Sequence, residues 1–144
     1  MSEKILTELS KLLSDTYALL IKTQNYHWHV NGPHFKSLHE LFEEQYVSLA
    51  TAVDLIAERI VTLGGIAPAS FEDFSKLTSI HKGNSHATSG DMVADLYKDH
   101  AQVIKDMNNA IKIAQDNEDE GSISLLSERI AAHEKMRWML GASK

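Results

Sequence analysis

The stretch NYHWHVNGPHFKSLHELFE, residues 25–43, decides how the chain folds. Its centre, Asn31-Gly32-Pro33, is a helix stop, because glycine commonly ends a helix and a following proline cannot continue it. Long segments with apolar side chains at helical spacing lie on both sides of this stop. The sequence therefore predicts two antiparallel helices joined by a tight turn, one over about residues 3–30 and the other over about 35–63.

The rest of the chain predicts two more helices after a long connection. Residues 66–90 form that connection, and a short apolar piece at 71–77 predicts one or two helical turns within it. A third helix starts near Ser89 or Asp91, either of which could be its N-terminal cap, and a fourth follows an acidic turn at 116–121. Alternation typical of strands is nearly absent. We therefore expect an all-α fold with a single domain over residues 1–144, a ferritin-like four-helix bundle with one long crossover.

Composition narrows the classes of function. The chain has 144 residues, no cysteine and a formal net charge of -6. It has no apolar run near the ~18 residues that span a bilayer, and its first residues do not resemble a signal peptide. These features predict a cytoplasmic protein that does not associate with membranes and binds nucleic acid poorly. Eight histidines and twenty carboxylates without cysteine favour metal chemistry with nitrogen and oxygen ligands.

The second predicted helix carries two pairs of metal-ligand side chains. His39 and Glu43 are four residues apart, as are Asp54 and Glu58, so each pair lies on one face of the helix. Glu43 and Asp54 are eleven residues apart, or ~16 Å along a helix, too far to hold one ion together. Either the pairs are unrelated, or two copies of the helix run antiparallel about a two-fold axis and build two identical sites.

A further ligand is predicted from the first helix. His27 lies seven residues after Leu20 and continues the apolar stripe, so it faces inward. The second helix returns after the turn, which brings His39 back toward His27. Two imidazoles and three carboxylates, with few protein ligands per ion, suit redox-active iron.

At these residues the sequence resembles the Dps-like family, the mini-ferritins. The resemblance rests on Asn25–Phe35, Leu38–Glu44, Asp54–Ile60 and Leu63–Gly65, and Trp138 fits as well. It implies a hollow shell of twelve subunits that oxidises Fe(II), preferentially with hydrogen peroxide rather than dioxygen, and keeps ferric mineral inside. It also implies ferroxidase ligands from two neighbouring subunits: His27, His39 and Glu43 from one, Asp54 and Glu58 from the other.

Several residues have two interpretations at this level. Glu43 stands where the family often has Asp, and His29 stands where Asn is common. We expect Trp28 to serve packing first, or to donate electrons beside the metal. Arg59 is either an interface ion pair or a solvated charge. The acidic run 116–120 is either a solvated turn or part of a three-fold pore that draws Fe(II) inward.

Three other functions compete with iron oxidation and storage. The main alternative is a nucleoid protein that coats DNA, but the start of the chain has only Ser2, Glu3 and Lys4 before the first helix, so no basic arm is predicted there. An intrabundle di-iron enzyme typically carries Glu-x-x-His motifs, and no histidine here has Glu three residues before it. If the protein were a simple helical interaction module, the two ligand pairs would have arisen by chance.

Overall fold

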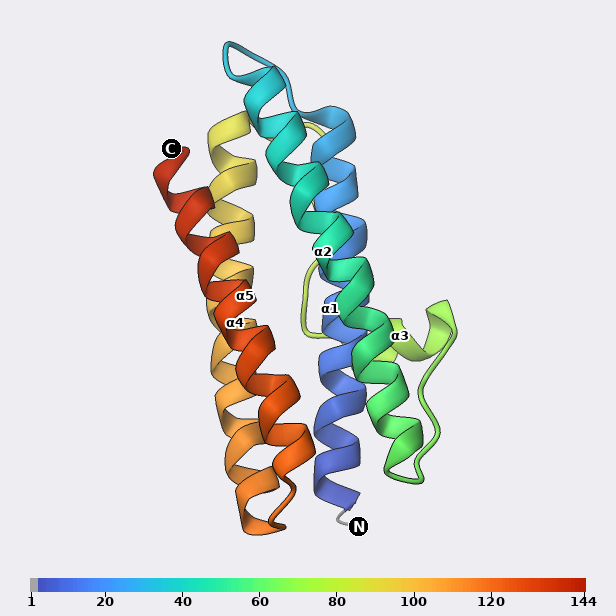
Figure 1. The fold of residues 1–144 in the computed structure, drawn as a ribbon. Coiled ribbons are helices and arrows are strands. Elements are labelled where there is room, and N and C mark those ends of the chain that lie inside the picture. The colour runs from blue at the N-terminus through green and yellow to red at the C-terminus, as the bar shows by residue number, and fades with distance from the viewer. Residues whose placement is uncertain (1–2) are drawn as a thin grey trace.

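The computed structural model describes residues 3–144, and Ser2 of the predicted short start lies outside them. The described residues form helices only, so the predicted all-α bundle with a short helix on its crossover is confirmed (Figure 1). No helix within residues 3–144 combines the length and the apolar character that crossing a membrane requires. The five helices are α1 (Glu3–His29), α2 (Phe35–Thr62), α3 (Phe71–Leu77), α4 (Ser89–Asp116) and α5 (Glu120–Ala142).

The helices form two antiparallel pairs that pack side by side. Helix α1 packs most extensively against α2, and α4 against α5. Figure 1 shows the crossover running the length of the bundle, so that α4 starts at the end where the α1–α2 turn lies. The C-terminus returns to this same end, while the α4–α5 turn lies at the opposite end.

The core consists of the apolar stripes that the helical spacing predicts. The side chains at the centre of each stripe have lost nearly all contact with solvent because four helices surround them. Burial of this apolar surface is the main stabilising contribution to the bundle. The fully buried representatives include Leu9, Leu12, Phe42, Leu49, Ile56, Leu96 and Leu126.

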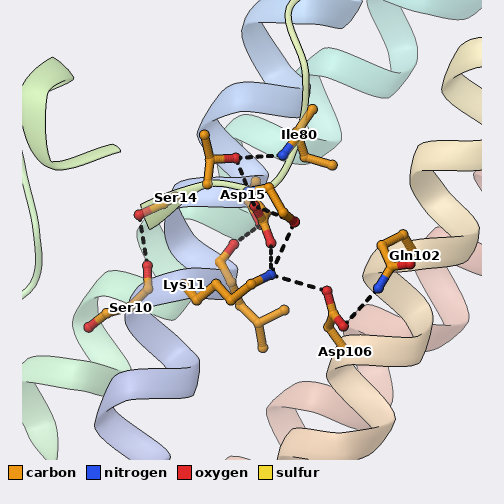
Figure 2. A network of polar contacts seen from close by, with 11 residues as sticks. Ser10, Lys11, Ser14, Asp15, Ile80, Gln102 and Asp106 are labelled. Carbon is orange, nitrogen blue, oxygen red and sulfur yellow. Dashed lines mark hydrogen bonds and ion pairs between the residues drawn. The ribbon is translucent and has the colours of Figure 1, made fainter. Parts of the chain in front are cut away.

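A buried carboxylate on α1 anchors the crossover. Asp15 accepts hydrogen bonds from the Thr78 hydroxyl at 2.7 Å and from the Ser79 backbone N–H at 2.8 Å. Its second oxygen accepts from the Lys11 ammonium at 2.7 Å, and Lys11 also reaches Asp106 on α4 at 3.2 Å (Figure 2). The long connection is therefore held to α1 and α4 at this point.

A second set of polar contacts ties the last turns of α1 to α4. The Lys22 ammonium, which is buried, bonds Asp95 at 2.9 Å and Asp99 at 2.7 Å. The Tyr26 hydroxyl donates to Asp95 at 2.5 Å and accepts from the Asn84 backbone N–H at 3.3 Å. This end of α1, which carries His27, is therefore rigidly placed.

The helix ends follow local chemistry, with one difference from expectation. Gly32 has a φ of +106°, a conformation that favours glycine, and it turns the chain between α1 and α2. Helix α4 begins at Ser89 as predicted, but its cap is Thr88, whose hydroxyl accepts from the Asp91 N–H at 3.1 Å. Neither Ser89 nor Asp91 is the cap, because both already lie in the first turn.

Arg59 and the acidic run are joined in a way that the sequence did not predict. The Arg59 guanidinium pairs with Asp119 of the same chain at 2.6 Å, so it is not a solvated charge, and an additional ion pair across an interface stays a prediction. Asp119 is buried and also caps α5, whereas Asp116, Glu118 and Glu120 are exposed. Burial would raise the pKa of Asp119, but hydrogen bonds from Ser122 and the Arg59 charge outweigh it and hold that pKa below its usual range.

Candidate metal centre

The α1–α2 turn brings two histidines together. His27 lies in the last turn of α1 and is buried, and His39 lies in the second turn of α2. Their rings stack with centroids 3.8 Å apart and planes 14° from parallel. The sequence prediction that the returning helix would place His39 beside His27 agrees with this geometry.

Each histidine is bonded to the backbone of the other. His27 Nδ1 lies 2.7 Å from the His39 carbonyl oxygen, and His39 Nδ1 lies 2.7 Å from the His27 carbonyl oxygen. A carbonyl oxygen only accepts, so both Nδ1 atoms must carry the proton and donate it. Both Nε2 atoms are then left with a free lone pair, which is the form of imidazole that binds a metal ion.

Glu43 adds a carboxylate to the two imidazoles. Its Oε1 lies 3.6 Å from His27 Nε2, and its side chain is 57% exposed. Both atoms could reach one ion at about 2 Å, since histidine and carboxylate ligands bind first-row metals at that distance. The carboxylate faces outward, so an ion held here would meet solvent or another molecule.

Aromatic rings flank the imidazole pair. Phe35, the first residue of α2, stacks on His39 with centroids 5.0 Å apart, and Tyr46 meets His27 edge-on at 5.3 Å. Neither ring was singled out from the sequence, although Phe35 and His39 are four residues apart on α2, a spacing that places them on one face of the helix. The contact between Tyr46 and His27 instead depends on the packing of α2 against α1.

The other two predicted ligands lie elsewhere on α2. Asp54 and Glu58 are exposed and lie eleven and fifteen residues beyond Glu43, about 16 and 22 Å along the helix. Among residues 3–144, no group of three or more His, Asp or Glu side chains within one chain is arranged to hold a metal ion. One chain places His27 beside His39 and beside Glu43, but it does not form a complete site, and the shared site stays a prediction.

Two neighbours of His27 lie on the outer side of α1. Trp28 is 64% exposed, so the expected packing role is not fulfilled within its own chain. His29 is also exposed, and its Nδ1 contacts the Asn25 carbonyl oxygen at 2.8 Å and the Asn25 side chain at 2.7 Å. It points away from the His27 side of the helix, as its two-residue offset predicts.

A second histidine pair lies inside the bundle. His100 of α4 and His133 of α5 are both fully buried, with their Nδ1 atoms 2.8 Å apart. Neither Nε2 has a hydrogen-bond partner. Burial, together with the nearby Arg129 charge, lowers the pKa of His100 to about 3. Helical spacing places both on apolar stripes, but their pairing was not predicted because it depends on the packing of α4 against α5.

Known proteins resemble the chain over nearly its whole length. A family model for the ferritin-like domain matches residues 6–143. An uncharacterized low temperature-induced protein of Nostoc is 40% identical over 139 residues, covering 94% of this chain and 77% of that protein. The DNA protection during starvation protein 2 of Bacillus anthracis is 36% identical over 142 residues, covering 99% and 97%. A Dps crystal structure from Vibrio cholerae, described as a member of the ferritin-like diiron-carboxylate superfamily, has a TM-score of 0.93 and 30% identity, covering 97% and 88%.

Proposed function

Because the chain belongs to the ferritin-like family as a Dps-like member, we propose that it oxidises Fe(II) at sites shared between two subunits. In this proposal the ferric product is stored as mineral in a hollow shell, and oxidative damage is reduced. His27, His39 and Glu43 of one subunit bind iron together with Asp54 and Glu58 of its neighbour.

The single observation that carries the proposal is the half-site on α2. At one end of the helix, His39 of α2 and His27 of α1 place two imidazole rings beside the exposed carboxylate of Glu43. The other end presents Asp54 and Glu58, both exposed and one helical turn apart. Two α2 helices that run antiparallel about a two-fold axis would bring the unlike ends together twice.

The residues supply binding and orientation, while the iron substrate supplies the electrons. Neutral imidazole and carboxylate ligands suit iron that must change its oxidation state. Two Fe(II) give one electron each to hydrogen peroxide, which takes up two protons and leaves as two water molecules. Peroxide consumed in this way does not form hydroxyl radicals, so the reaction would protect DNA without contact. The name of the Bacillus anthracis relative refers to DNA protection during starvation.

We further propose that two-fold dimers assemble into a shell of twelve in the cytoplasm. The geometry of α2 requires only the dimer, and the number twelve follows from the family resemblance. The formal net charge of -6 per chain makes the assembled particle strongly negative. Such a surface attracts Fe(II) and repels phosphates.

The proposal is tested by complementation between two inactive chains. Anaerobic Fe(II) oxidation by hydrogen peroxide is followed in stopped flow for His39→Ala, for Asp54→Ala and for particles reassembled from both. Each variant alone should lose the fast phase. In a mixed dimer one site carries both changes and the other carries none, so the reassembled particles should regain part of the wild-type amplitude.

A site within one chain would give no recovery on mixing, and that result would contradict the shared arrangement. The matched control is Glu44→Ala, an exposed acid next to Glu43 on α2, which should oxidise iron at the wild-type rate. A consumption of about two Fe(II) per peroxide, the two-electron expectation, identifies the oxidant. Running the same mixtures with dioxygen determines which oxidant is preferred.

DNA coating is not proposed for this chain, because negative charge opposes phosphate binding. We expect no mobility shift of plasmid DNA by the iron-free particle at neutral pH and low salt. A shift under those conditions would restore the nucleoid-coating alternative.

A further inference from the structure

Four rings form one continuous column at the α1–α2 turn. Phe35 stacks on His39 at 5.0 Å with planes 26° apart, and His39 stacks on His27 at 3.8 Å. Tyr46 closes the column with its ring edge-on to His27, at 5.3 Å and 68°. Each imidazole therefore packs against the other imidazole and against one aromatic side chain.

The hydrogen bonds alone do not orient the imidazoles completely. Each carbonyl bond holds one ring atom, Nδ1, but a ring can still tilt about that atom. A tilt moves Nε2 and its lone pair away from the place where Glu43 Oε1 lies, 3.6 Å from His27 Nε2. A ring packed against each imidazole opposes this tilt, because aromatic pairs favour defined stacked or edge-to-face arrangements.

Burial in the core does not explain the position of Phe35. It is the first residue of α2 and is 43% exposed, and His39 is its ring partner. Tyr46 is half-buried and lies one turn beyond Glu43, on the side of His27. Both residues come from α2, the helix that also carries His39 and Glu43. The two aromatic rings and these two predicted ligands therefore belong to one helix.

We propose that Phe35 and Tyr46 are positioning residues for the metal site, which hold the two imidazole planes and thereby set the affinity for a divalent cation. The inference rests on the proposed function, because it concerns the same His27, His39 and Glu43 half-site. It adds that removing an aromatic ring, with every ligand left in place, weakens metal binding.

The test uses Co(II) alone, bound without oxidant to the assembled protein, so that affinity is separated from iron turnover. The visible absorption of Co(II) reports the geometry of its ligands. Phe35→Leu and Tyr46→Leu keep apolar bulk but lose the aromatic face. Each should bind Co(II) about 3- to 10-fold more weakly with an altered spectrum, the size expected for one aromatic pair. The number of Co(II) ions bound should not change.

Two conservative variants and one distant variant complete the series. Phe35→Tyr and Tyr46→Phe keep the rings and should bind Co(II) as the wild type does. Phe71→Leu makes the same change at a phenylalanine that is 83% exposed on α3, and it should have no effect. Size-exclusion chromatography of every variant reports the assembly state. If Phe35→Leu alters assembly, the comparison of Tyr46→Leu with Tyr46→Phe decides the question.

The outcomes separate this inference from the proposed function. Wild-type Co(II) affinity and spectrum in both leucine variants would overturn the positioning role while leaving the shared site in place. Absence of Co(II) binding by the wild type would instead remove the metal site itself, and the proposed function with it. Weaker binding in Phe35→Leu and Tyr46→Leu, with recovery in Phe35→Tyr and Tyr46→Phe, supports the proposal.

Discussion

The chain contains two histidine pairs whose surroundings give them opposite chemistry. In the turn pair, His27 and His39, both Nδ1 atoms donate to backbone carbonyls and both Nε2 atoms are free beside an exposed carboxylate. In the core pair, His100 and His133, the Nδ1 atoms bond each other and the Nε2 atoms lie buried without a partner. The charged side chain that acts on the pKa of both core histidines is the Arg129 cation, which lowers both values.

The difference shows that the partner of Nδ1 and the access to Nε2 decide what a histidine pair does. A backbone carbonyl fixes one tautomer on each ring, so the turn pair offers two metal-binding nitrogens at once. The core pair shares one proton between its Nδ1 atoms, and no carboxylate is there to balance a cation. The turn pair is therefore suited to binding a metal ion. The core pair instead contributes to packing, and it makes the stability of the bundle sensitive to acid.

The largest expected effect is the loss of activity when the turn pair is broken. Changing a group that only supports a metal ligand costs about 10- to 100-fold, so loss of a ligand should cost more than about 100-fold. His27→Ala should therefore slow peroxide-driven Fe(II) oxidation by at least that factor, while its unfolding free energy falls by only about 1 kcal/mol. Stopped flow and urea unfolding measure the two quantities. Activity within tenfold of wild type would remove His27 from the site.

The core pair should respond in the opposite way. His133→Ala leaves a cavity and an unpaired His100 Nδ1 in the centre of the bundle. It should lower the free energy of unfolding by about 2–4 kcal/mol, yet leave the Fe(II) oxidation rate of the folded protein unchanged. Urea unfolding at fixed protein concentration measures the loss, with exposed His29→Ala as control. A cost under about 1 kcal/mol would show that the core pair packs loosely.

The pH dependence of stability sharpens the same contrast. The pKa of His100 is about 3 in the folded chain and near 6.5 when exposed, so between these values the unfolded chain binds more protons. Stability contributed by His100 is thus complete above pH 6.5 and declines as the pH falls. The loss should reach about 2 kcal/mol at pH 5, since one pKa unit corresponds to 1.36 kcal/mol.

Urea unfolding at pH 7.5 and pH 5.0 measures this loss. The variant His100→Leu/His133→Leu, which removes both rings, should lose less stability than the wild type between these two values. The matched control His81→Gln changes an exposed histidine of the crossover and should lose as much as the wild type. Equal losses in all three proteins would mean that acid acts elsewhere in the molecule.

The smallest expected effect concerns His29, which belongs neither to the turn pair nor to the core pair. His29 is exposed and its Nδ1 contacts Asn25, but no second imidazole or carboxylate accompanies it. His29→Asn should leave the Fe(II) oxidation rate within about twofold of wild type, as surface changes away from special features usually have small effects. A larger change would add a third member to the turn site.

The helices could be predicted from the sequence because their signals are local. The seven residues of α3 agree with the predicted piece 71–77, and the Asn31-Gly32-Pro33 stop separates α1 from α2 as expected. The proximity of His27 and His39 also follows from a turn only a few residues long. The assembly of Asp54 and Glu58 with them is not contained in one chain and stays a prediction.

Contacts between segments that are far apart in the chain could not be predicted from the sequence. Arg59 and Asp119 are 60 residues apart, and each had other interpretations until packing brought them within 2.6 Å. The exposure of Trp28 and the bond between His100 and His133 are further cases. In each, helical spacing determines the face of a helix but not its rotation and height relative to a neighbour.

By itself, the sequence determined the helices, their order, the crossover and the ligand types at a spacing that suits iron. The tertiary structure alone decided the tautomers of the turn pair, the ring column around it, and the isolation of the core pair. The physical reason is the distance along the chain over which each interaction acts. Backbone hydrogen bonds and apolar periodicity act over a few residues, whereas ring stacking, ion pairing and burial depend on which surfaces of separate helices meet.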